Sequence, residues 1–331
     1  MKIGKVPPEI LIKCVFPFTG KQRQEVLVHS GLGEDCTVID FGSHVAVASS
    51  DPITAADIQS GHLAVYVSCN DIAACGAKPI GILVTLLLPP DSDSNMLKDL
   101  MANIHSAASK IGIEILGGHS EITSAVVKPV ICSTAIGIAE KEKYVTSSGA
   151  KPGDDVIVTK ALGLEGSSIL ATDFEYFLID KIPANFIQTA KNFIEQISVI
   201  EEGLIAADIG ASAMHDITEG GILGAAFEVA EASGVGIEII NERLPILKET
   251  QAICKAFGIN PLGLISSGSM LICTPHGSKV VDALNQKGIP ATIVGKIIPE
   301  GKYIISSGNR FSLKPLERDE LIAAIEKVKR A

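Results

Sequence analysis

Carboxylates flank a predicted β-hairpin near the start of the chain. The runs CTVIDF and HVAVAS favour strands, and Gly42-Ser43 between them is a two-residue loop with glycine first, which predicts a type II′ turn. Counting back from this turn sets Glu34 opposite Asp51, with Asp35 beside them. Facing like charges destabilise a hairpin unless a cation such as Mg²⁺ lies between them. The alternatives are a ladder that ends earlier and leaves these carboxylates solvated, or a β-bulge that shifts the register.

A further aspartate lies in the apolar segment SCNDIAACGAKP. The pattern predicts a helix over about 61–76, with one continuous stripe formed by Leu63, Val67, Asn70, Asp71 and Ala74. On this stripe the Asp71 carboxylate is costly to bury unless it is paired, hydrogen-bonded or metal-bound. Cys69 and Cys75 lie roughly 120° apart around the helix, which is unsuitable for chelating one ion. We interpret both cysteines as small buried side chains.

A glycine pair and a histidine follow another predicted strand. The run IEIL leads into Gly117-Gly118, where backbone can approach a phosphate closely. His119 comes next, followed by Ser120 and Glu121, and these side chains have the chemistry to bind a metal or orient a water. The alternative for His119 is a hydrogen-bonded loop histidine.

The stretch HDITEGGILGAAFEVAEASG predicts the start of a helix. Asp216 and Glu219 fit a D-x-x-E capping arrangement. Glycine costs about 1 kcal/mol relative to alanine inside a helix, so two adjacent glycines indicate close approach by another backbone or by an anion. Asp216 is therefore either a cap alone or a cap that also reaches a metal.

Helix and strand patterns mix in both halves of the chain, which predicts an α+β protein. A polar link over 141–155 interrupts the pattern, so we place a boundary near residue 150, with domains at 1–150 and 151–331. Helices are also expected at 94–110, 165–173, 184–209 and 219–233 and from 318 onward, and strands at 81–89, 126–139, 236–240, 269–274 and 291–298.

Composition and charge exclude several classes of protein. The formal charge of -10 argues against a nucleic-acid binder, so a phosphate ligand would need glycine-rich backbone, helix N-termini or divalent cations. Seven cysteines without a CxxC pair do not indicate a secreted disulfide framework. The N-terminal segment MKIGKVPPEILIK has prolines where a signal peptide needs an apolar core, and the longest apolar run, 80–88, is too short to span a bilayer. We therefore expect a cytoplasmic protein without a membrane span.

Taken together and in order, seven segments resemble the PurM-like ATP-binding superfamily: GLGEDCTVID, SSDPIT, SCNDIAACGAKP, GGHSE, KPGDDVIVTK, HDITEGGI and SSGSML. This superfamily includes aminoimidazole ribonucleotide (AIR) synthetase, the hydrogenase-maturation protein HypE, thiamine-monophosphate kinase and selenophosphate synthetase. The resemblance spans nearly the whole chain. It implies two α+β domains and a homodimer whose N-terminal halves form a shared β-barrel. It also implies ATP- and Mg²⁺-dependent phosphorylation of an oxygen, often of an amide or thiocarboxamide.

The resemblance also implies roles for individual residues. The superfamily's metal-binding acids correspond to Asp35, Asp51 and Asp71. Its nucleotide-contacting segments correspond to Asn70, Gly117 and Gly118, with His119 beside them, and the acid before the C-terminal glycine pair corresponds to Asp216. No residue is identified as catalytic, because such chemistry consists of phosphate positioning and charge neutralisation.

The second half looks most like the hydrogenase-maturation type, with three departures. Ser267 stands where that type carries glutamate, His119 where it commonly carries aspartate, and the last cysteine is Cys273, so the Cys-ended tail that receives a carbamoyl group is missing. Selenophosphate synthetase would call for a reactive N-terminal cysteine, which Cys14 in KCVFPF does not match. Thiamine-monophosphate kinase has an Asp-rich pattern that His119 and Glu219 break.

We therefore expect a divergent subgroup with ligase, dehydratase or kinase chemistry. Its substrate would be a small molecule or a protein thiocarboxamide. The alternatives are a nucleotide-binding partner in a maturation complex that does not turn ATP over, a small-molecule kinase like thiamine-monophosphate kinase, and a metal-stabilised structural homologue.

Overall fold

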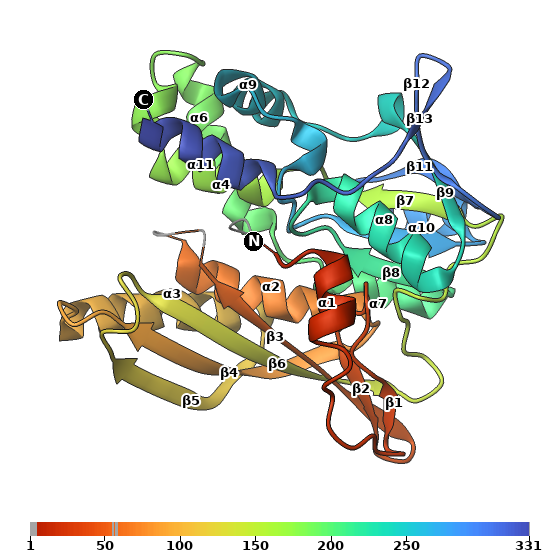
Figure 1. Ribbon diagram of the computed structural model, residues 1–331, viewed down its shortest axis with the longest axis horizontal. Coiled ribbons are helices and arrows are strands. Elements are labelled where there is room, and N and C mark those ends of the chain that lie inside the picture. The colour runs from red at the N-terminus through yellow and green to blue at the C-terminus, as the bar shows by residue number, and fades with distance from the viewer. Residues whose placement is uncertain (1–4, 55, 57–58, 331) are drawn as a thin grey trace.

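A computed structural model describes residues 5–54, 56 and 59–330, and all structural statements concern these residues. The first four residues of the N-terminal segment lie outside them. The chain forms two α+β units, shown one above the other in Figure 1, with the short helix α1 (Pro8–Cys14) between them.

The first unit is a six-stranded sheet in the order β1-β2-β3-β6-β4-β5. All neighbours are antiparallel except β4 and β5. Its elements are β1 (Val26–Val28), β2 (Thr37–Asp40), β3 (His44–Ile53), α2 (Ser60–Ala74), β4 (Lys78–Leu88), α3 (Ser94–Ile111), β5 (Glu114–Ile122) and β6 (Val130–Glu140). The sheet is open within one chain, so a single copy does not form the barrel that the resemblance implies.

The second unit is a seven-stranded sheet in the order β13-β12-β9-β11-β7-β10-β8. Its strands are β7 (Asp155–Thr159), β8 (Ala213–Asp216), β9 (Gly236–Ile240), β10 (Met270–Thr274), β11 (Ala291–Ile298), β12 (Lys302–Ser306) and β13 (Asn309–Ser312). Its α-helices are α4 (Leu164–Asp173), α5 (Glu175–Leu178), α6 (Ala184–Lys191), α7 (Ile200–Ile209), α8 (Gly221–Ser233), α9 (Lys248–Phe257), α10 (Gly277–Gln286) and α11 (Glu320–Arg330). Three short 3₁₀ helices complete it: η1 (Asn192–Gln196), η2 (Asn241–Arg243) and η3 (Pro261–Gly263).

Helices cover the second sheet on both faces, which explains why its strand β10 is buried along its whole length. Alternate residues of β10 enter two different cores: Leu271 packs in the core that contains α8, and Ile272 in the core that contains α7 and α10. Successive side chains of a strand point to opposite faces, so a strand buried on both sides needs an unbroken apolar run. All five residues of β10 are buried.

The predicted hairpin is confirmed in its register and turn. Thr37 pairs with Ala48 and Asp40 with Val45, as counting back from the loop requires. Gly42 has a φ of 88°, the left-handed conformation that the first loop position of a type II′ turn demands.

The ladder ends at Thr37, so the predicted pairing of Glu34 with Asp51 is wrong. The chain before β2 instead turns against α8. A side chain at Gly33 would meet the carbonyl oxygen of Glu228 at 2.9 Å, so glycine is what permits this close contact. Asp51 continues along β3 opposite Ser133 of β6.

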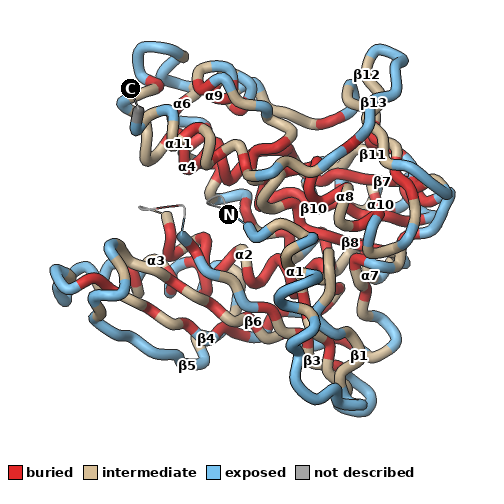
Figure 2. Tube along the Cα trace, in the orientation of Figure 1, coloured by how far each residue is buried: buried red, intermediate tan, exposed pale blue. Residues whose placement is uncertain are grey.

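Helix α2 lies between the first sheet and the second unit. The predicted stripe is only part of its buried surface, because thirteen residues of this helix are buried and they lie on nearly all of its sides. A helix enclosed on all sides needs no polar face. Figure 2 shows buried segments of α2 and β8 where the two units meet.

Several other boundaries differ from the predicted ones. The glycine pair lies inside β5 and not in a loop after it. The predicted helix over 184–209 is broken into α6, η1 and α7. Asp216 ends β8, and α8 begins at Gly221, so the predicted D-x-x-E cap is not formed. The close approach of another backbone is confirmed, since a side chain at Gly221 would meet the carbonyl oxygen of Leu262 at 2.5 Å.

Candidate functional site

Two acids of the first unit share one serine hydroxyl. Ser49 and Asp51 lie two residues apart on β3 and therefore point to the same face of the sheet. The Ser49 hydroxyl donates to Asp71 Oδ2 at 2.5 Å and lies 3.4 Å from Asp51 Oδ2. Burial, together with the charges of Asp216, Asp51 and Asp35, raises the pKa of Asp71 well above its usual value. The predicted association of Asp71 with a carboxylate cluster is thus what the geometry shows.

Asp216 brings the second unit to the same place. It ends β8 and is fully buried, and neither of its carboxylate oxygens has a hydrogen-bond partner of good geometry, although the Asp71 carboxyl lies close by. Burial raises the pKa of Asp216 to about 6. Unpartnered buried oxygens of this kind are costly, so the arrangement calls for a ligand that the protein itself does not supply.

Asp35 reaches the cluster through the turn before β2. Its Oδ2 atom is buried without a hydrogen-bond partner and lies 3.4 Å from His215 Nδ1. Burial raises the pKa of Asp35 to about 7, although the charge of His215 acts in the opposite direction. The four acids Asp35, Asp51, Asp71 and Asp216 therefore converge, even though the ladder that was expected to gather two of them ends early.

His215 supplies positive charge beside this cluster. Its Nδ1 lies 2.6 Å from the Asp216 carbonyl oxygen and its Nε2 lies 3.1 Å from Glu228 Oε2. Both ring nitrogens face acceptors, so both carry protons. Burial alone would lower the pKa of His215, but the charges of Asp35 and Glu228 outweigh it and raise the pKa to about 10.

A Mg²⁺ ion fits the carboxylates, whereas the imidazole is unsuited to bind it. Ligand atoms of Asp35, His215 and Asp216 lie within 4.8 Å of one another. Because both His215 nitrogens donate hydrogen bonds, the ring has no lone pair to offer a metal. The unpartnered oxygens of Asp35 and Asp216 are hard oxygen donors, which Mg²⁺ prefers.

Asn70 is fully buried and its amide joins the two units. Its Nδ2 donates to the Ile197 carbonyl at 2.9 Å, and its Oδ1 accepts from the Val199 amide at 2.9 Å. These bonds hold the start of α7 against α2. Asn70 thereby fixes the position of its neighbour Asp71.

The glycine pair lies away from the carboxylates of its own chain. Gly118 pairs with Val84, which pairs with Ser133, which pairs with Asp51, so three strand spacings, about 14 Å, separate Gly118 from Asp51. Gly117 and Gly118 have φ values of 145° and 144°, and a side chain at Gly118 would meet the Val84 carbonyl oxygen at 1.8 Å. His119 is exposed on this edge strand, 3.5 Å from Glu121.

Three residues of the site were missed by sequence reasoning. Ser49 could have been found, because it lies two residues before Asp51 and so on the same strand face. His215 is adjacent to Asp216 in HDITEGGI, but nothing in the sequence indicates that its ring turns toward Asp35. Glu228 gave no signal, since its approach depends on the packing of α8.

The seven cysteines, all within the described residues, are free thiols. Cys69 and Cys75 are buried, as expected for small packing residues. No helix among the described residues is both long enough and apolar enough to cross a bilayer.

Comparison with known proteins places the chain in a family. Residues 33–139 match the N-terminal domain, and residues 151–307 the C-terminal domain, of AIR synthase related proteins. The chain belongs to the AIR synthase related family. This membership confirms the PurM-like, HypE-type resemblance of its motifs.

Relatives of this AIR synthase related protein have different activities. It is 30% identical to the selenide, water dikinase of Methanococcus maripaludis over 82% of its own length and 85% of the relative. It is 24% identical to the carbamoyl dehydratase HypE of Rhodobacter capsulatus, over 88% and 85% of the two chains. A solved structure of the hydrogenase maturation protein HypE in complex with ATP is similar in fold, with a TM-score of 0.69, 19% identity and coverage of 97% and 98%.

Proposed function

We propose that this protein is an ATP- and Mg²⁺-dependent enzyme that phosphorylates an oxygen of a small amide, thiocarboxamide or phosphate-type substrate. The observation that carries the proposal is the convergence of Asp35, Asp51 and Asp71 from one unit with Asp216 from the other. Buried carboxylates with unpartnered oxygens are stable together when a divalent cation neutralises them. A HypE of the same fold was solved with ATP, which supports a nucleotide as the ligand that carries this cation.

Each residue of the cluster has a distinct part in this proposal. Asp35, Asp51, Asp71 and Asp216 would hold Mg²⁺, which neutralises phosphate charge when bound. The Ser49 hydroxyl fixes the orientation of Asp71. His215, held by Glu228, limits the repulsion between Asp35 and Asp216.

We also propose a homodimer through the first sheet. Its outer face exposes large apolar side chains, with exposed fractions of 47% for Ile80, 41% for Leu83 and 40% for Ile138. Several large apolar side chains exposed on one sheet face are typical of an interaction surface. In such a dimer the edge strand β5, which carries Gly117, Gly118 and His119, would lie at the contact between copies. We therefore also propose that the two first sheets form a shared barrel and that Gly117, Gly118 and His119 contact the nucleotide.

Calorimetric titration tests the nucleotide site directly. Asp51→Asn should weaken binding of a non-hydrolysable ATP analogue with Mg²⁺ by about tenfold or more, since it removes a charged ligand. Cys75→Ala, which alters a buried residue without charge, is the matched control and should bind as the wild type does. Equal loss in both variants contradicts the assignment, and no binding by the wild type overturns the proposal.

A screen for ADP release separates an enzyme from a binding module. The purified protein is incubated with ATP, Mg²⁺ and candidate amides, thiocarboxamides and phosphate esters. Release of ADP that depends on one candidate and is lost in Asp51→Asn supports phosphoryl transfer. Tight ATP binding without ADP under any candidate favours a nucleotide-binding partner in a maturation complex.

A further inference from the structure

A cavity of about 620 Å³ adjoins the carboxylate cluster. Its walls come from the N-terminal segment with α1, the turn before β2, the start of α8 and the segment 315–319. Asp35 belongs both to this cavity and to the cluster, so a molecule bound in the cavity lies directly beside the proposed Mg²⁺-ATP site. The volume is in the range of small-molecule sites.

The described residues that line this cavity are strongly acidic. They include seven carboxylates, among them Glu34, Asp35, Glu219 and Glu228, and two cations, Lys5 and Arg318. Arg318 is paired with Glu326 at 2.7 Å. Such a lining repels a polyanion, so the triphosphate of a nucleotide is a poor occupant. Pro7, Leu32 and other apolar side chains complete the walls.

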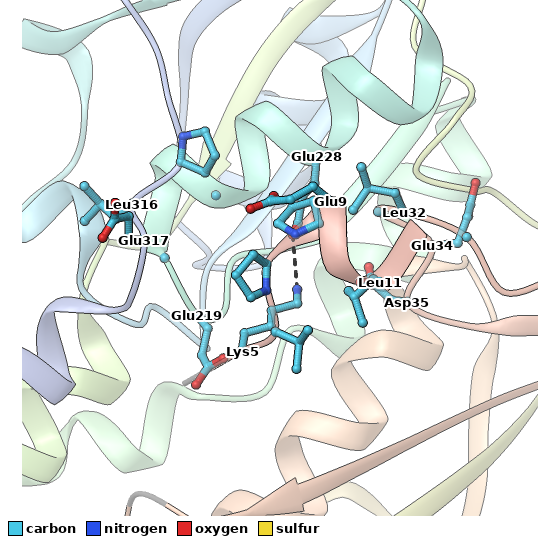
Figure 3. A pocket seen from close by; sticks show the side chains of 18 of the residues that line it. Lys5, Glu9, Leu11, Leu32, Glu34, Asp35, Glu219, Glu228, Leu316 and Glu317 are labelled. Atoms are coloured by element: carbon cyan, nitrogen blue, oxygen red, sulfur yellow. Dashed lines mark hydrogen bonds and ion pairs between the residues drawn. The ribbon is translucent and has the colours of Figure 1, made fainter. Parts of the chain in front are cut away.

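The ammonium group of Lys5 is bound by this acidic lining. Lys5 Nζ lies 3.1 Å from Glu228 Oε1, the ion pair drawn as a dashed line in Figure 3, with Glu219 beside it. Burial acts against it, but the charges of Glu228, Asp35 and Glu219 raise the pKa of Lys5. The Lys5 side chain is 53% exposed, so its ammonium can leave without unfolding of the units.

The Glu228 carboxylate is held in an orientation that can bind a cation whether or not Lys5 contacts it. Its Oε2 atom is held by His215 Nε2 at 3.1 Å, while Oε1 faces Lys5. The carboxylate therefore keeps its orientation when Lys5 moves away. Hydrogen bonds from an ammonium or amidinium to such a fixed carboxylate are among the stronger polar contacts in proteins.

We propose that this cavity binds a small organic cation, an ammonium or amidinium on a short apolar body, at the place that Lys5 Nζ holds. The identification of this cation as the phosphoryl acceptor rests on the proposed function. The binding itself does not. The acceptor's positive group would be anchored at Glu228 and Glu219, and the remainder would extend along the apolar wall toward Asp35. The acceptor oxygen would lie at that far end, where it takes the γ-phosphoryl group while ADP leaves.

Binding of butylammonium, with butyramide and butyrate as neutral and anionic probes of similar shape, tests this proposal by calorimetry on the full chain in EDTA. Lys5→Met keeps the aliphatic stem and removes the competing ammonium. In the wild type the Lys5 ammonium is tethered beside the site and competes at an effective concentration of about millimolar or more. Butylammonium should therefore bind the Lys5→Met variant at least about tenfold more tightly than it binds the wild type. Lys13→Met, which removes an exposed lysine of α1 outside the cavity, is the matched control and should leave binding unchanged.

Loss of the carboxylate gives the opposite result. Glu228→Gln in the Lys5→Met background should weaken butylammonium binding at least tenfold, and Glu219→Gln provides a second variant that leaves the pair of His215 with Glu228 intact. Thermal unfolding verifies that each variant is folded. The proposal is overturned if butyramide or butyrate binds as tightly as butylammonium, or if butylammonium does not bind Lys5→Met at all.

Titrations with the nucleotide separate this inference from the proposed function. If the wild type fails to bind the ATP analogue with Mg²⁺, the proposed function fails, yet cation binding in EDTA is still measured. If butylammonium binds and displaces the ATP analogue, the cavity is part of the nucleotide site, and its assignment to the acceptor is wrong. Simultaneous binding of both is the expected result.

Discussion

Asp216→Asn should stabilise the metal-free protein while it abolishes metal binding. Asp216 is fully buried among other acids, and its oxygens have no good protein donor. Without a cation, its negative charge opposes folding. The substitution removes that charge and keeps the shape of the side chain, so a gain in stability is expected together with a loss of function.

The magnitude follows from the pKa of this aspartate. A rise from 3.8 in the unfolded chain to about 6 in the folded protein corresponds to roughly 3 kcal/mol of destabilisation at pH 8. The folded state binds the proton more tightly, so stability falls as pH rises from about 4 to 6 and stays low above that. A buried asparagine amide without partners costs about 1–2 kcal/mol. The net gain at pH 8 is therefore about 1–2 kcal/mol, or an increase of about 1–3 °C in the Tm of this chain.

Thermal unfolding in EDTA at pH 8 and pH 5 measures this effect. At pH 5 about half of the penalty remains, which roughly cancels the cost of asparagine, so the variant and the wild type should unfold at similar temperatures. Mg²⁺ with a non-hydrolysable ATP analogue should raise the Tm of the wild type only. Asp208→Asn, at a side chain that is 74% exposed on α7, is the matched control and should match the wild type throughout.

Two results would refute this reasoning. The first is a lower Tm for Asp216→Asn than for the wild type in EDTA at pH 8. The second is stabilisation of this variant by Mg²⁺ and the ATP analogue to the same extent as the wild type.

Three further predictions concern stability and assembly. Burial raises the pKa of Glu165 to about 7, so the free energy of unfolding falls as pH rises from about 4.5 to 7. Glu165→Gln should therefore be more stable than the wild type by up to roughly 3 kcal/mol at pH 8 but by little at pH 4.5. Equal Tm differences at both pH values would contradict this. Asn70→Ala leaves two buried backbone groups without partners and should lower the free energy of unfolding in urea by about 2–4 kcal/mol, while the exposed Asn285→Ala should change it little. Leu83→Glu buries a charge in the proposed dimer contact and should give monomers by light scattering, and a dimer that persists would exclude this face.

Local patterns predicted much of the first unit correctly. The β-rich runs around Gly42 fixed both the turn and the register, because a two-residue loop permits few alternatives. Helix α3 ends at Ile111, one residue after the predicted end, because the next residue, Gly112, adopts the left-handed conformation that closes helices, with a φ of 72°. In the second unit, β9 and β11 have the predicted bounds.

Predictions that depended on neighbouring elements were less accurate. The ladder could not be followed past Thr37, because Gly33 brings the preceding turn against α8, an element almost two hundred residues later in the chain. The capping interpretation of Asp216 was wrong because a short strand, β8, pairs with β10 at that point. The predicted stripe on α2 covered only part of its buried surface, because a second unit covers the remaining sides of the helix.

The sequence by itself identified the four acids of the site. Asp35, Asp51, Asp71 and Asp216 were identified from their motifs, and the cysteines were set aside on their spacing alone. Only the tertiary structure decided how these acids meet, since two units have to pack together before Asp71 and Asp216 become neighbours. The same packing assigned Asn70 to the contact between the units and brought His215 and Lys5 beside the acids. Like charges repel one another and are costly to bury, so local sequence preferences do not bring them together. Their association depends on the burial of the apolar surface around them.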